Sequence, residues 1–124
     1  MKNYLLVFVG GGTGAAARYW LSGAVYRFVP ANFPYGILAV NILGCFIIGL
    51  LMTVSLERYM ISSTIRVFLT VGILGGFTTF SSFSYETVAL LQDGELQRAI
   101  LNVFFTVAGC LLATSLGSLM GRII

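Results

Sequence analysis

The sequence predicts an all-α membrane protein with four transmembrane helices. Of its 124 residues, 58% are hydrophobic and only 9% are charged, whereas a soluble domain carries about 25% charged residues. The apolar residues gather in four runs that approach the roughly 20 residues a bilayer requires. These runs cover approximately residues 4–26, 36–56, 67–91 and 99–121. We therefore expect residues 1–124 to form a single four-helix transmembrane domain with both termini on one side.

The first run has features that compete with a helical span. Lys2 and the apolar stretch after it resemble a secretory signal peptide. However, "YLLVFVGGGTG" is rich in glycine for such a segment, and cleavage would leave three spans with no first helix to pack them. Residues 10–15 also imitate a dinucleotide-binding fingerprint, which requires a βαβ unit and an acidic residue about 20 positions later. The first acid after them is Glu57, so we expect a transmembrane helix here.

Polar or reactive side chains are few in the second and fourth runs. The amide of Asn41 offers two donors and an acceptor, so it is either an interhelical hydrogen-bonding residue or a donor that lines a pore. Thr106 and Thr114 pose the same choice, with packing as the simpler role. Cys45 and Cys110 lie far apart in the sequence and lack metal-site spacing. We interpret both as small membrane-core residues and not as a disulfide.

The third run contains the unexpectedly polar stretch "GGFTTFSSFSYE". Gly75 and Gly76 permit unusual backbone angles at low steric cost, and Thr78 and Thr79 can cap a restarted half-helix. We therefore predict that the third helix is broken near Gly75–Thr79. Backbone groups freed by a break are tolerated in a membrane only when they are buried in protein or line a cavity. Freed carbonyls at a close helix crossing can hold a small cation.

Side chains beyond this break predict an anion path. At helical spacing, Phe80 and Phe83 share one face and Ser81 and Ser84 share the neighbouring face. Aromatic rings have a positive edge, so two rings turned edge-on beside hydroxyl donors can attract a small anion. A lysine in this place would risk holding the anion too tightly for conduction. The alternative for each residue is packing, with each serine bonded to the carbonyl four residues earlier.

Glu86 follows the same tract. A charged carboxylate at mid-membrane costs about 2.5–3.5 kcal/mol on insertion scales and less near the interface. It therefore faces a wet vestibule or a partner, or it is a harmless acid at the membrane surface. The sequence favours neither reading.

Glycine recurs at four-residue spacing, a pattern that lets membrane helices approach closely. We expect a packing role for most of the 15 glycines. The pairs are Gly10 and Gly14, Gly72 and Gly76, and Gly117 and Gly121.

Basic residues specify the orientation in the membrane only weakly. Lys2, Arg58, Arg66 and Arg122 belong to one side, Arg27 and Arg98 to the other, and Arg18 lies near that second end. Orientation depends on lysine and arginine asymmetry, so this weak bias suits insertion in both directions.

Four short helices have little room to enclose a polar path, which favours an oligomer, most simply a dimer. The singly scattered charges do not suit a nucleic-acid partner.

Three segments together resemble the Fluc (CrcB-type) family of fluoride channels. They are "GGGTGAAARYW" (10–20), "YGILAVNILGCFIIG" (35–49) and "GILGGFTTFSSFSYE" (72–86). The resemblance covers essentially the whole chain, and the third segment is highly specific. It implies an antiparallel, dual-topology homodimer with two pores that export fluoride passively. It further implies a multi-pass protein of the cell inner membrane, with no enzymatic activity and with a structural sodium ion at the dimer centre.

The resemblance also implies roles for individual residues. Phe80 and Phe83 correspond to a pair of rings that contact fluoride edge-on, and Asn41 to a pore asparagine. Ser81, Ser84 and Thr114 belong to the polar track, and Glu86 to its vestibule end. The backbone carbonyls of Gly75 and Thr78 would bind the sodium ion. Arg18 corresponds to a first-helix arginine near the dimer or membrane interface.

Two residues depart from the family pattern. Cys110 stands where the family pattern suggests serine, and Ala39 where threonine is common, so the fluoride sites nearest them are in doubt.

Two rival functions are also considered. A proton-coupled transporter of the small multidrug-resistance kind has a similar size, but its chemistry centres on a first-helix glutamate. The first run of this chain carries Arg18 and no acid. An assembly subunit of a membrane complex would not need the hydroxyl and phenylalanine tract.

Overall fold

The computed structural model describes residues 1–58 and 61–124 and consists of helices joined by short connections. The connection expected after the second helix includes residues 59 and 60, which lie outside the described residues. Within the described part the elements are α1 (Lys2–Val25), α2 (Tyr35–Glu57), α3 (Ser63–Val67), the π-helix η1 (Phe68–Leu74), α4 (Gly75–Phe77), α5 (Phe80–Gln92) and α6 (Leu96–Ile123).

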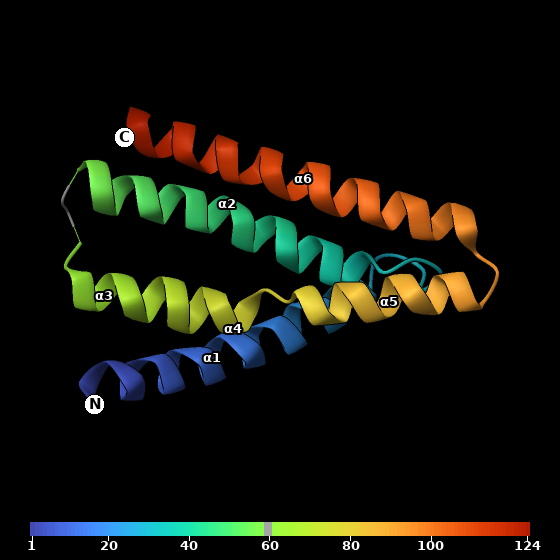
Figure 1. Ribbon diagram of the computed structural model, residues 1–124, viewed down its shortest axis with the longest axis horizontal. Coiled ribbons are helices and arrows are strands. Elements are labelled where there is room, and N and C mark those ends of the chain that lie inside the picture. Colours follow the sequence, from blue (N-terminus) through green and yellow to red (C-terminus); the bar gives the residue numbers. More distant parts are fainter. Residues whose placement is uncertain (59–60) are drawn as a thin grey trace.

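The helices form four columns, and both chain termini lie at the same end of the molecule (Figure 1). One column is composite, because α3, η1, α4 and α5 follow one another along a common line with a short gap before α5. The column of α2 packs against α6, whereas α1 packs mainly against η1 and α4. A chain that crosses a membrane an even number of times has both termini on the same side, and the two termini of this chain lie at the same end.

Three of the columns are long and apolar enough to cross a membrane. They are Tyr35–Glu57, the composite column Ser63–Gln92, and Leu96–Ile123. The α1 helix has 24 residues, which is a sufficient length, but it is less apolar than the other three columns. Its sequence contains five glycines as well as Lys2 and Arg18. The prediction of apolar spans is therefore confirmed for three columns, and α1 stays a predicted fourth.

Glycines bring α1 into backbone contact with the composite column. A Cβ atom added at Gly14 would collide with the Ile73 carbonyl oxygen, and one added at Gly76 would collide with the Gly11 carbonyl oxygen. At Gly10 an added Cβ would lie 3.0 Å from Gly72 Cα. The two helices therefore touch through main-chain atoms, as the glycine spacing predicted.

The contact between α2 and α6 depends on glycine in the same way. A Cβ added at Gly49 would meet the Thr114 carbonyl oxygen, and one added at Gly117 would meet the Phe46 carbonyl oxygen. At Gly121 an added Cβ would lie 2.9 Å from Thr53 Cβ. The Gly117 and Gly121 pair thus has the packing role expected from its spacing.

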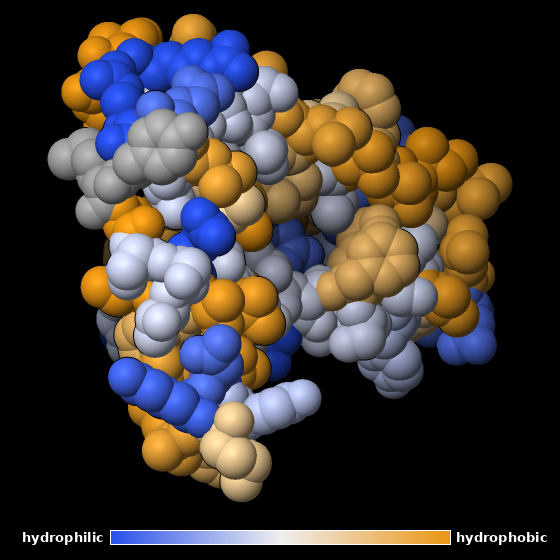
Figure 2. Space-filling view, turned by 60° about the vertical axis from the view of Figure 1, so that its left-hand side comes forward, coloured by the Kyte–Doolittle hydropathy of each residue, from blue (hydrophilic) through white to orange (hydrophobic). Residues whose placement is uncertain are grey.

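Polar groups gather at the ends of the columns and hydrophobic side chains cover much of the flanks. Figure 2 brings forward the end that carries the termini, where hydrophilic residues lie, with hydrophobic surface extending behind it. At this end Arg122 lies 3.4 Å from Glu57, and Arg58 donates to the Arg122 carbonyl. Large exposed side chains on the flanks include Phe8, Trp20 and Leu111. Apolar surface on this scale suits a lipid environment better than water.

The opposite end contains the turn between α5 and α6, at Asp93 and Gly94. Gly94 has a φ of 76°, a left-handed conformation that glycine adopts without steric cost. Glu95 and Arg98 lie 3.7 Å apart just beyond it. The turn reverses the chain so that α6 runs back beside α2 (Figure 1).

Candidate functional site

The composite column is broken at Thr78 and Thr79. Both residues have extended backbone, with ψ of 156° and 119° respectively. The Thr79 hydroxyl accepts a hydrogen bond from Ser82 N at 3.2 Å and so caps α5, as predicted. Thr78 instead donates its hydroxyl to the Leu74 carbonyl at 3.0 Å. It therefore completes the half-helix before the break.

The break lies at the Thr78–Thr79 end of the predicted range Gly75–Thr79, and Gly75 and Gly76 do not form it. Both are helical, and Gly75 has φ −62° and ψ −38°. The physical reason is packing, because Gly76 must lack a side chain to contact Gly11 of α1. The chain leaves the helix two residues later, where threonines supply the hydroxyl groups that cap both sides.

Asn41 of α2 satisfies the main chain at the break. Its Nδ2 donates to the Thr79 carbonyl at 3.0 Å, and its Oδ1 accepts from the Thr79 N–H at 2.9 Å. Both hydrogen bonds are buried, so they replace the helical bonds that the break removes. The interhelical role of Asn41 is therefore present. One of its two N–H donors stays free of Thr79.

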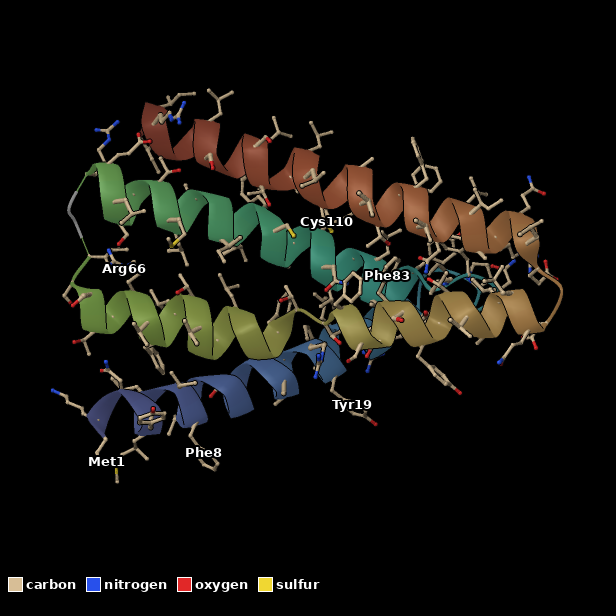
Figure 3. All side chains as sticks on the ribbon, in the orientation of Figure 1. Met1, Phe8, Tyr19, Arg66, Phe83 and Cys110 are labelled. Atoms are coloured by element: carbon tan, nitrogen blue, oxygen red, sulfur yellow. The ribbon has the colours of Figure 1, made fainter. Side chains whose placement is uncertain are left out.

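Phe80 and Phe83 begin α5 directly after the break. Their ring centroids are 5.3 Å apart and the rings are inclined by 60°. Phe83 is 7% exposed, whereas Phe80 is 77% exposed. Figure 3 shows Phe83 pointing from α5 toward the side where α2 and α6 lie. The closeness of the two rings was predicted from their helical spacing. The burial of only one of them within a single chain was not predicted.

A cavity of about 310 Å³ lies against these rings. None of its lining residues within the described part of the chain is charged. They are Asn41, Cys45, Thr78, Thr79, Phe80, Phe83, Thr106, Val107, Cys110 and Leu111. Thr106 is buried, and its hydroxyl oxygen has no hydrogen-bond partner in the described structure. The wall therefore combines a ring pair, an amide and a free hydroxyl, all of them neutral.

The serines of the tract lie outside this cavity. Ser81 is exposed, and its hydroxyl is 3.2 Å from the Thr79 hydroxyl. Ser84 is exposed one turn further along α5. Ser82 lines a different pocket, of about 550 Å³, together with Arg18 and other α1 residues. The hydroxyl groups therefore surround the break instead of lining a single path in one chain.

Glu86 faces a separate pocket of about 250 Å³ at the end of α5. The pocket also includes Tyr26, Asn32 and Asp93, which are polar residues of neighbouring connections and helix ends. The Oε2 atom of Glu86 is buried and has no hydrogen-bond partner among the described residues. The pocket lies toward the α5–α6 turn, at the end of the columns opposite the chain termini.

Comparison with known proteins identifies the family. Residues 5–118 match the family described as CrcB-like protein, Camphor Resistance (CrcB).

The chain belongs to the CrcB-like family.

Close relatives share this CrcB-like sequence over nearly its full length. A protein of Geotalea uraniireducens is 50% identical over 122 residues, which is 98% of each chain. One from Geobacter sulfurreducens is 49% identical over the same share, and one from Geotalea daltonii is 50% identical over 100% of both chains. All three are named fluoride-specific ion channel FluC. The relatives are named as channels and not as enzymes, in agreement with the prediction that this chain has no enzymatic activity.

Two further predicted positions of the CrcB-like chain lie away from the cavity. Arg18 of α1 reaches the break, with its Nη1 atom 3.5 Å from the Thr78 carbonyl oxygen. Thr114 lies two turns beyond Thr106 on α6, where its main chain contacts α2 at Gly49. The cavity wall in this chain thus contains Thr106 in place of Thr114.

Asn102 is a buried polar residue that was not predicted from the sequence. This α6 residue is 2% exposed, and its Nδ2 donates to the Thr87 hydroxyl at 3.0 Å. Thr87 in turn donates to the Phe83 carbonyl at 2.8 Å. The only available signal was helical spacing, because Asn102 lies one turn before Thr106 on the same face. It anchors α6 to the turn of α5 that carries Phe83.

Cys45 and Cys110 are far apart in the sequence but belong to the same site. They come from α2 and α6, and both are half-buried free cysteines. Both line the cavity beside Phe83. Helix packing therefore places two residues that are far apart in the sequence in one cavity wall.

Proposed function

We propose that this chain forms a fluoride-selective channel that exports fluoride passively and lowers its concentration in the cytoplasm. The observation that carries the proposal is the uncharged cavity at the break, with Phe83 buried in its wall. Full-length relatives named fluoride-specific ion channels support the same conclusion. The chain would be a multi-pass protein of the inner membrane with α1 as its fourth span.

Neutral groups in the cavity provide the chemistry for a small anion. The positive edge of the Phe83 ring is an electrostatic partner for fluoride. The free hydroxyl of Thr106 and the second N–H of Asn41 can donate hydrogen bonds that replace lost water. Since none of these groups carries a full charge, the anion is held weakly enough to leave, as conduction requires.

The proposed unit is an antiparallel, dual-topology homodimer with two pores. Phe80 is 77% exposed in one chain, and Ser81 and Ser84 are exposed beside it. A second copy packed there would enclose these groups and join them to the polar track, with Thr114 and Glu86 further along it. The weak asymmetry of basic residues in the sequence agrees with insertion in both directions.

A structural sodium ion at the dimer centre would be held by the carbonyls of Gly75 and Thr78. The Thr79 N–H donates to Asn41 and so leaves the Gly75 carbonyl without its usual helical partner. The Thr78 carbonyl lies in extended backbone. Neutral oxygen ligands of this kind suit a small cation, and a second copy would double their number. The Arg18 guanidinium would share the Thr78 oxygen with the ion.

Fluoride efflux from sealed lipid vesicles containing the purified chain tests the proposal. We expect a fluoride gradient to dissipate electrogenically without any proton gradient, while chloride stays behind. Flux that requires a proton gradient would favour a coupled transporter instead. Absence of fluoride flux would contradict the channel proposal.

A further inference from the structure

A single side-chain hydrogen bond connects α5 to α6 within the described part of the chain. Asn102 of α6, which is 2% exposed, donates through Nδ2 to the Thr87 hydroxyl of α5 at 3.0 Å. A cavity of about 700 Å³ lies between the same two helices, and apart from Thr87 its lining residues are apolar. Because this cavity interrupts the direct packing of α5 on α6, the hydrogen bond from Asn102 is the specific connection between them.

Thr87 extends this connection to the turn that carries Phe83. A hydroxyl has one proton to donate, and Thr87 donates it to the Phe83 carbonyl at 2.8 Å. Threonine in a helix divides between two side-chain orientations, and the Asn102 amide stabilises the one observed. The three residues therefore form a chain of hydrogen bonds from α6 to the main chain of Phe83.

The α5 helix depends on such a connection because it is not continuous with the helix before it. The backbone is extended at Thr78 and Thr79, and Asn41 of α2 holds the Thr79 end. At a rise of about 1.5 Å per residue, Thr87 lies about 12 Å further along. Two attachments, one to α2 and one to α6, restrict the tilt of α5 more than one attachment does.

The tilt of α5 determines how the Phe83 ring meets the cavity of about 310 Å³. The ring is 7% exposed and points toward the side where α2 and α6 lie (Figure 3). Thr106, whose free hydroxyl belongs to the same cavity wall, lies one turn after Asn102 on the same face of α6. Asn102 therefore ties the ring on α5 to the helix that supplies this hydroxyl.

We propose that Asn102 is a positioning residue, which acts through Thr87 to hold the Phe83 ring in the cavity wall, and that this placement sets the rate of fluoride passage. The placement of the ring rests only on the hydrogen bonds and the burial described above. The effect on rate rests on the proposed function. A hydrogen bond that only stabilises the helix bundle would leave the ring and the rate unchanged.

Nuclear magnetic resonance of ¹⁹F tests the placement of the ring. The purified protein, with 4-fluorophenylalanine in place of Phe83, is measured in detergent solution free of fluoride. We expect Asn102→Leu and Thr87→Val to displace or broaden the ring signal in the same way, because each removes the same hydrogen bond. Thr87→Ser keeps the hydroxyl and should retain the wild-type signal. An unchanged signal in Thr87→Val would overturn the proposal, even where Asn102→Leu does not fold.

Thr13→Val is the matched control for the loss of a threonine hydroxyl. Thr13 donates to the Val9 carbonyl at 2.8 Å on an exposed face of α1, so it makes the same local bond as Thr87. No side chain of another helix in the described structure bonds to it. We expect the Phe83 ring signal to stay unchanged in this variant. A displacement equal to that in Thr87→Val would overturn the role of the connection to α6.

Fluoride efflux from vesicles tests the effect on rate. We expect Asn102→Leu and Thr87→Val each to lower the initial rate by roughly fivefold, and the double variant to lower it no further, because the two residues act as one unit. Independent effects would multiply to about 25-fold in the double variant and would overturn the shared action.

The two measurements also separate failure of this inference from failure of the proposed function. A displaced ring signal with wild-type efflux would overturn the effect on rate. No fluoride efflux from the unmodified protein would overturn the proposed function, while the ring signal still decides whether Asn102 positions Phe83.

Discussion

Asn41 contacts both main-chain groups of Thr79 with a single amide, at 3.0 Å and 2.9 Å. A buried backbone group without a partner costs about 1–3 kcal/mol, so the break between α4 and α5 would be expensive without this side chain. Thr79 completes the arrangement by capping α5 through Ser82 N. At the scale of single residues, the amide therefore both stabilises the break and leaves one donor for the cavity.

Replacement of Asn41 tests this double role. We expect Asn41→Leu to lower the free energy of unfolding by at least about 2 kcal/mol, because two buried backbone groups lose their partners. Unfolding in mixed detergent micelles measures the change. Asn102→Leu is the matched control, since this buried amide bonds one side chain, Thr87, and should cost less. An equal or smaller loss for Asn41→Leu would contradict the assignment.

Some features of single residues could be predicted from the sequence, and others could not. The adjacency of Phe80 and Phe83 and the cap at Thr79 follow from local spacing, so they were predictable. The partner of Asn41 and the position of Cys45 and Cys110 in one cavity wall depend on how α2 and α6 are rotated about their axes. In helices that are apolar on most sides, no periodic pattern specifies that rotation.

At the scale of elements, glycine positions determine where helices touch. The π-helix η1 and the short α4 lie against α1, and the contact places Gly14 directly against the Ile73 carbonyl. The sequence predicted close packing from the Gly10 and Gly14 spacing. It also predicted a break near Gly75–Thr79, and the break lies at the Thr78–Thr79 end of that range because Gly76 packs against α1.

Gly14→Ala should therefore disturb the α1 contact. The added Cβ meets a main-chain oxygen that cannot rotate away, so we expect a loss of about 1–3 kcal/mol in the free energy of unfolding. Gly12→Ala is the matched control, because nothing lies within 4 Å of its added Cβ. Thermal unfolding of both variants in the same detergent measures the difference. Equal stability of the two would contradict the observed packing.

At the scale of the whole molecule, one chain leaves its candidate site open. Phe80 is exposed, and Gly75 has free space, with the nearest atom to an added Cβ being Thr70 O at 3.7 Å. Composition predicted the membrane environment, because only 9% of residues are charged. The way in which a second copy packs depends on the exposed surfaces of the folded chain, and the hydrophobic pattern of the sequence does not specify those surfaces.

Gly75→Leu separates folding of the chain from assembly. Since the single chain has room for the side chain, we expect helical content and thermal stability of the isolated chain to be retained. A second copy packed near the break would be displaced, so the dimer fraction in detergent should fall. Size-exclusion chromatography with light scattering measures this fraction. A dimer fraction equal to that of wild type would contradict the placement of the second copy at the break.

The central claim is that the buried ring of Phe83 helps conduct fluoride through an uncharged cavity. Fluoride efflux from vesicles, recorded with a fluoride-selective electrode, tests it through Phe83→Ile and the matched control Phe8→Ile, whose ring is 78% exposed on α1. We expect efflux to fall by roughly tenfold or more in Phe83→Ile, a ratio equivalent to about 1.4 kcal/mol, and to be retained in Phe8→Ile. Undiminished efflux in a folded Phe83→Ile variant would contradict the claim.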